Sequence, residues 1–183
     1  KLKSEEAIAA EKTMFEKQSK AVAEKDKAKR NFETNTKDLR AAIRSADVGL
    51  SLIAEGDKTG SYKGLSKMAS PTIAKAIGDS RVTQQEQTMY ANPATSIGGT
   101  LAEKYAELVK GEPSKENIEL YRKFFNNLKA TAGAAIEREA EKQHFSAMQN
   151  IRSFGKIDNV PLSDKDVMSY IKGTDKSFEQ MVT

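Results

Sequence analysis

The feature that most constrains the fold is the stretch of residues 114–154, which contains no proline and keeps a helical period throughout. Apolar side chains recur every three or four residues, with one polar interruption at Gln143, as on one face of an α-helix. These side chains are Ile118, Tyr121, Phe125, Leu128, Ala132, Ile136, Ala140, Ala147, Ile151 and Phe154. A helix over 115–154 would be roughly 60 Å long. We expect it to be the central helix, with Phe125 and Leu128 in the core.

Residues 4–54 predict a second long helix. In its first half, pairs of small or apolar residues recur seven apart, a spacing typical of a coiled-coil seam. The pairs are Ala7/Ile8, Met14/Phe15 and Ala21/Val22, and the facing positions are Glu11, Gln18 and Lys25. Because this seam is narrow and half polar, it can bury little area within one chain. We therefore expect residues 4–28 to extend from the core and to contact a partner helix through Ile8, Phe15 and Val22.

The second half of this helix, 32–53, has a fuller apolar stripe and is expected to pack antiparallel to the central helix. Gly56 and Gly60 are expected to stop it. Residues 55–113 hold seven of the eleven Gly and three of the four Pro, which favours short helices between breakers. We predict these helices at about 71–78, 83–91 and 101–110.

After Gly155, the sequence from Ser163 to Asp166 predicts a capped helix that Gly173 ends, followed by a tail to residue 183. No stretch alternates apolar and polar residues as a strand would. The predicted fold class is therefore all-α: an elongated helical bundle of two long helices, about 4–54 and 115–154, with short helices between and after. We expect an extended coiled-coil helix over 1–31 and a helical domain over 32–183. Within that domain we distinguish a short-helix middle (55–113), the central helix (114–154) and a C-terminal helix with its tail (155–183).

Composition excludes several function classes. The chain has 183 residues and no Cys, so disulfides and thiolate chemistry are excluded. No apolar run is long enough for a membrane-spanning helix. The sequence begins without Met, which suggests a fragment or processed product. The net charge is +4, but basic and acidic residues alternate along the chain, which is typical of solvated helix faces.

The densest basic run offers an alternative function, nucleic-acid binding. Its candidate contacts are Lys17, Lys20, Lys27 and Arg30. On a helix these side chains spread around more than one face, acidic residues lie between them, and no aromatic side chain is interleaved to stack on bases. A solvated helix is therefore the favoured interpretation.

No constellation of residues predicts catalysis, a cofactor or a metal. His144 is the one histidine, and helical spacing puts Glu137 and Glu141 within its reach. Such a group on an amphipathic helix is usually solvent-facing, and a general base needs convergent partners. Asp158, Asp164 and Asp166 lack the register of a calcium loop, and the glycines form no phosphate-binding loop.

The order of the segments resembles a known class of proteins. A Lys/Glu/Ala-rich helix leads into residues 55–64 (EGDKTGSYKG), then to residues 80–86 (SRVTQQE), then to the long helix from about 115 to 154. This order is similar to segments of tailed-bacteriophage internal virion or DNA-ejection proteins. The resemblance covers residues 40–150, concerns helix caps and breakers, and transfers no catalytic residue. It implies a structural part of a virion.

The function expected from these observations is that of a non-enzymatic helical assembly protein. It would be located in a phage particle and act through helix–helix contacts in a homo-oligomer and with other virion proteins. The alternative functions are a bacterial helical interaction module or effector fragment, and the nucleic-acid-binding protein described above. The alternative location is the bacterial cytoplasm.

Overall fold

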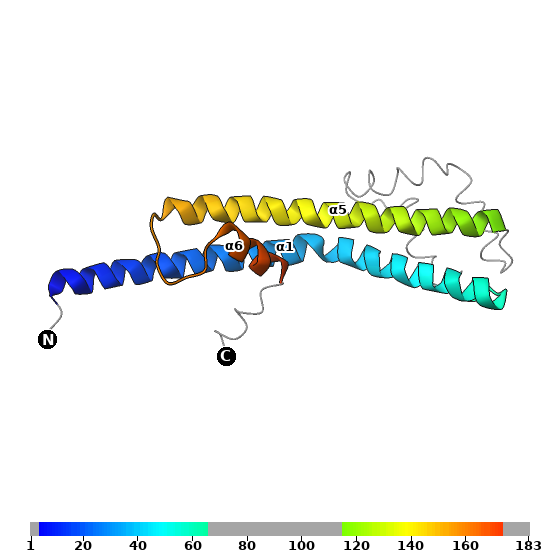
Figure 1. Cartoon of the computed structure of the whole chain (residues 1–183), viewed down its shortest axis with the longest axis horizontal. Helices are drawn as coiled ribbons and strands as arrows, with labels where there is room; N and C mark the ends of the chain where they lie inside the picture. The colour runs from blue at the N-terminus through cyan, green and yellow to red at the C-terminus, as the bar shows by residue number, and fades with distance from the viewer. Residues whose placement is uncertain (1–3, 66–114, 174–183) are drawn as a thin grey trace. The chain divides into compact units, whose positions relative to one another are not determined.

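The computed structural model describes residues 4–65 and 115–173, and within these ranges it contains helices and no strand. Three helices are labelled in Figure 1: α1 (Glu5–Thr59), α5 (Lys115–Ser153) and α6 (Asp164–Lys172). Residues 63–65, the last before a range that the structure does not describe, are also helical. The predicted all-α class and both long helices are confirmed. The short helices predicted at 71–78, 83–91 and 101–110 lie outside the described residues.

The first helix is longer than predicted at its C-terminal end. It continues past residue 54 to Thr59, so Gly56, one of the two glycines expected to stop it, lies inside the helix. The Tyr62 ring packs so closely on Gly56 that a Cβ there would collide with it. The helix ends at Gly60, which has a positive φ of 74° and donates its amide to the Gly56 carbonyl at 2.8 Å. Glycine adopts this left-handed conformation without the steric penalty other residues would incur.

The chain divides into two compact units, and α1 and α5 each contribute to both. Unit 1 comprises the residues up to Lys37 and those from Ile136 onward, and unit 2 comprises Asp38–Ala135. The boundaries therefore fall inside the two long helices, whereas the sequence suggested a division at residue 31.

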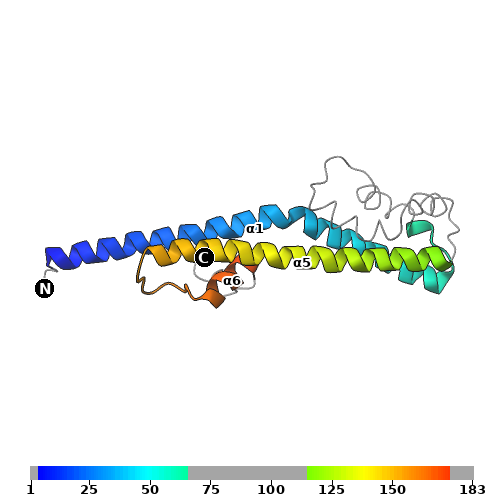
Figure 2. The ribbon, with the colours of Figure 1, turned by 90° about the horizontal axis from the view of Figure 1, so that it is seen from above.

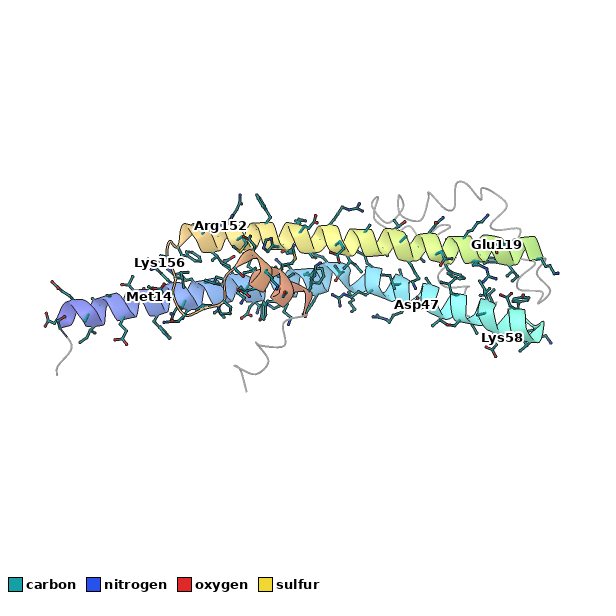
Figure 3. All side chains as sticks on the ribbon, in the orientation of Figure 1. Met14, Asp47, Lys58, Glu119, Arg152 and Lys156 are labelled. Carbon is teal, nitrogen blue, oxygen red and sulfur yellow. The ribbon has the colours of Figure 1, made fainter. Side chains whose placement is uncertain are left out.

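Unit 2 has its core between α1 and α5. Its buried side chains include Ile53 and Leu65 on one side and Phe124, Phe125 and Leu128 on the other. Phe125 is 0% and Leu128 1% exposed, which confirms their predicted place in the core. Ion pairs join Asp47 to Lys129 and Asp57 to Arg122, so the pairing is antiparallel, as expected. Figure 3 labels Asp47 and Lys58 on α1 and Glu119 on α5.

Unit 1 buries small residues where its helices meet. Ala21 and Ala28 of α1, and Ala140 and Ala147 of α5, belong to one core cluster that also contains Val167 and Ile171 of α6. Small side chains allow helix axes to approach closely. The short α6 therefore completes the core of this unit and does not lie on its surface as an accessory.

Hydrogen bonds fix the register of α1 and α5 in unit 1. Asn150 donates to Glu24 at 2.8 Å, Asn31 to Gln143 at 3.4 Å, and Asn35 to Glu139 at 2.7 Å. Each advance of seven or four residues along α1 is matched by an equal retreat along α5, so these helices are also antiparallel. Gln143, which interrupts the apolar stripe, is 8% exposed and also donates to Glu139 at 2.7 Å.

The predicted capping box of α6 is present. Ser163 Oγ accepts from the Asp166 amide at 3.1 Å, and the Asp166 carboxylate accepts from the Ser163 amide at 3.2 Å. Two amides that an uncapped helix leaves unpaired are thereby satisfied. Gly173, with φ of 73°, ends the helix as predicted.

Candidate interaction surface

The first four turns of α1 are helical but have almost no packing partner within unit 1. Among residues 4–20, all of which the structure describes, no side chain is buried. Figures 1 and 2, views at right angles, both show the start of α1 running on past the C-terminal end of α5. A helix of this kind is marginal in water, because tertiary packing supplies most helical stability.

Two of the three predicted partner contacts are large exposed apolar side chains on these turns. Ile8 is 54% and Phe15 69% exposed. Val22 is half-buried, because it lies where α1 already packs within unit 1. Scattered exposed apolar residues are normal on a protein surface. Here, however, Ile8 and Phe15 lie seven residues apart on turns of α1 that contain no buried side chain. We call the exposed face of these turns, which has Ile8 and Phe15 along one edge, the candidate surface.

The polar positions of the predicted seam contact the protein's own chain. Gln18 Nε2 donates to the Asp158 carbonyl at 2.8 Å, and Lys25 Nζ donates to the Pro161 carbonyl at 3.1 Å. The segment between α5 and α6 therefore covers α1 from about residue 18 onward. Our expectation that all of residues 4–28 extend from the core is wrong for the C-terminal part, since Ala21, Lys25 and Ala28 are buried.

Lys25 is fully buried in a cluster built around Tyr170 of α6. Its Nζ lies 4.8 Å from the centre of the Tyr170 ring, and Lys29 Nζ lies 4.9 Å from the same centre. The Tyr170 hydroxyl donates to Asp26. Burial, followed by this hydrogen bond, raises the pKa of Tyr170 to about 12. The cluster uses cation–π and hydrogen-bond contacts to fix α6 on α1.

Three of the four candidate nucleic-acid contacts are exposed in the structure. Lys20, Lys27 and Arg30 are exposed, and Lys17 is half-buried with its Nζ close to Gly155. Near them, Glu24 is bonded to Asn150 and Asp26 to Tyr170. The acidic residues of this run therefore lie among the basic ones, as the sequence suggested.

His144 is placed differently from the prediction. Its side chain is 18% exposed, and its Nε2 lies 3.5 Å from Asp164 at the start of α6. Arg152 Nη2 lies 3.2 Å from both Asp164 carboxylate oxygens. Glu137, which helical spacing put within reach of His144, instead pairs with Lys172 at 2.5 Å. These contacts join α5 to α6, and His144 lies partly buried at this junction.

No cluster of three or more His, Cys, Asp or Glu side chains that could hold a metal ion occurs among the described residues. In the same part of the chain, no helix is both long and apolar enough to cross a membrane. No protein-family model, curated protein or solved structure matches this chain. The candidate surface is therefore assigned from its geometry.

Proposed function

We propose that this protein is a non-enzymatic helical assembly component whose first turns of α1 pair with a helix of another chain. The observation that carries the proposal is the exposure of Ile8 and Phe15 on a helical segment with no buried side chain. Helix-forming residues fill 5–20 without Gly or Pro, so the segment is suited to be helical. A partner helix would supply the apolar surface that its own chain does not provide.

The rest of unit 1 supports the same proposal. Lys25, Tyr170 and the hydrogen bonds between α1 and α5 hold the base of the projecting segment in one orientation. A rigid base lowers the entropy lost when a partner binds, because less of the helix must be ordered on contact.

The test is to place a charge on the candidate surface and measure mass in solution by light scattering and native mass spectrometry. We expect wild type to be oligomeric and Phe15→Glu to be monomeric. Phe145→Glu is the matched control, since Phe145 is 64% exposed but lies on α5, away from the first turns of α1. This control should leave the oligomer intact. A monomeric wild type at high concentration, or an oligomer unaffected by Phe15→Glu, would contradict the proposal.

The resemblance of residues 40–150 to phage internal proteins supports a narrower proposal, that the assembly is part of a virion. A particle component must form a repeating structure, which needs contacts beyond a single helix pair. Electron microscopy of the purified oligomer should then show a ring or a fibre. A discrete dimer would remove the virion proposal and leave the helix pairing standing.

A further inference from the structure

The face by which α1 packs in unit 1 continues into its exposed first turns. Residues 7, 14, 21 and 28 form one row at heptad spacing, occupied by Ala, Met, Ala and Ala. Ala21 is 0% and Ala28 4% exposed in the unit 1 core, whereas Met14 is half-buried and Ala7 exposed. One small residue of this row, Ala7, thus lies where α5 no longer runs alongside, and small side chains admit a close helix neighbour.

The length of the uncovered segment is set by the register of unit 1. Glu24 bonds to Asn150, so continuing the antiparallel register by three residues places Ser153, the last residue of α5, level with Ala21. The following segment reaches Gln18 through the Asp158 carbonyl. Residues 5–16, about three turns or roughly 18 Å, lie beyond this cover.

A second copy fits this space in one particular direction. If two copies meet antiparallel about a two-fold axis near residue 12, residues 5–16 of each copy lie beside residues 8–19 of the other. The end of each segment then meets the other copy's chain between α5 and α6, which covers α1 from about residue 18 onward. The two contacts are identical by symmetry, so one sequence segment provides both halves of a closed interface.

The charge distribution favours the same direction. Residues 4–11 carry Glu5, Glu6 and Glu11 and no basic side chain, for a net charge of −3. Residues 12–20 carry Lys12, Lys17 and Lys20 against Glu16, for a net charge of +2. Antiparallel pairing sets each acidic half opposite a basic half, whereas parallel pairing sets like charges together.

We infer that a second copy of this chain covers residues 5–16 in an antiparallel arrangement, with Ile8 of one copy beside Phe15 of the other. This inference rests on the proposed function and adds the identity and direction of the partner. It also places Glu11 of each copy next to Lys12 of the other, close to the two-fold axis.

Disulfide crosslinking can test the direction, because the chain contains no cysteine. Glu5→Cys and Ser19→Cys are made separately, at two exposed positions that leave Ile8 and Phe15 in place. When the two variants are mixed and oxidised, antiparallel pairing brings positions 5 and 19 together. In a parallel pair these positions are about 21 Å apart along the helix, out of disulfide range.

The expected result is a mixed 5–19 disulfide that exceeds both homodisulfides together. Phe145→Cys, an exposed position on α5, serves as the background control. Homodisulfides at 5 and at 19 in a protein of dimer mass would overturn the antiparallel inference and leave the proposed function intact. A dimer mass with no crosslink above background would overturn it as well. A wild type that is monomeric by mass would overturn the proposed function itself.

Discussion

The ring of Phe125 on α5 occupies the place where a side chain at Gly49 of α1 would lie. A Cβ at position 49 would be 2.5 Å from Phe125 Cζ and 2.6 Å from Cε2. Real Cβ atoms do not approach other carbons so closely, and Phe125 is itself fully buried. Gly49 thus provides the gap in α1 into which the Phe125 ring fits.

Gly49→Ala should therefore lower the free energy of unfolding by about 1–3 kcal/mol, the usual cost of overpacking a core. Urea denaturation followed by circular dichroism gives this quantity. Gly133→Ala is the matched control: Gly133 also lies inside a helix, but a Cβ there meets nothing within 4 Å. That substitution should stabilise the protein by about 0.5–1 kcal/mol through helix propensity. Equal effects of the two substitutions would refute the packing argument.

A double substitution separates the clash from a general effect at position 49. In the Phe125→Leu background the ring is absent, so adding Gly49→Ala should cost less than it does in wild type. Contacting residues show such non-additivity, whereas distant ones do not. Additive losses would mean that Phe125 is not the group displaced.

The sequence predicted the helices of unit 2 but not the contact between Gly49 and Phe125. The three- and four-residue period placed Phe125 and Leu128 in the core, because apolar spacing alone decides which face of a helix is buried. A glycine within a helix carries no such signal. Gly56 was interpreted as a helix stop, yet the helix continues through it to Thr59, and the Tyr62 ring packs against it. The contact between Gly49 and Phe125 joins residues far apart in the sequence, so it cannot be recovered from local spacing.

The sequence predicted the apolar residues of the candidate surface but not which part of the predicted seam the protein's own chain covers. Heptad spacing identified Ile8 and Phe15, and both are exposed. The same spacing assigned Lys25 to a partner seam, although it is buried in its own chain under Pro161 and Tyr170. Those partners are far along the chain, at residues 161 and 170, and nothing local to Lys25 indicates them. The capping box at Ser163 was predictable because its residues are adjacent in sequence.

Replacing the cap of α6 tests how far that helix depends on it. Ser163→Ala removes the acceptor for the Asp166 amide and should cost about 0.5–2 kcal/mol of stability. Ser163→Gly should cost only a few tenths, since glycine also suits the N-cap backbone. Thermal unfolding of the two variants provides the comparison. A Ser163→Ala variant as stable as wild type would show that the hydroxyl contributes nothing.

Asp57 in unit 2 should titrate below its ordinary pKa of 3.8. The hydrogen bond from Arg122, then that from the Tyr62 hydroxyl at 2.7 Å, stabilises the carboxylate and lowers this pKa. Stability from the shift is present above the unfolded pKa and is lost as pH falls through the folded one. Carboxyl NMR should show a midpoint below 3.8. Arg122→Gln should move the midpoint upward, and an unchanged midpoint would exclude the ion pair in solution.

The raised pKa of Tyr170 predicts that the protein loses stability at high pH. Because its folded pKa is about 12, against an ordinary 10.0, the folded protein holds this proton more tightly than the unfolded chain. The stabilisation is fully present below pH 10 and is lost as pH rises from about 10 to about 12. Lysines also deprotonate in this range, so the decline of wild type alone does not identify its source.

Tyr170→Phe isolates the hydroxyl, because phenylalanine keeps the ring that Lys25 and Lys29 contact. The variant should be less stable than wild type at pH 8, since it lacks the hydrogen bond to Asp26. The difference should shrink as pH rises from 10 toward 12, because only wild type loses the hydroxyl contribution. Urea denaturation across this pH range measures the difference in unfolding free energy between the two proteins. A difference that stays constant with pH would show that folding does not raise the pKa of Tyr170.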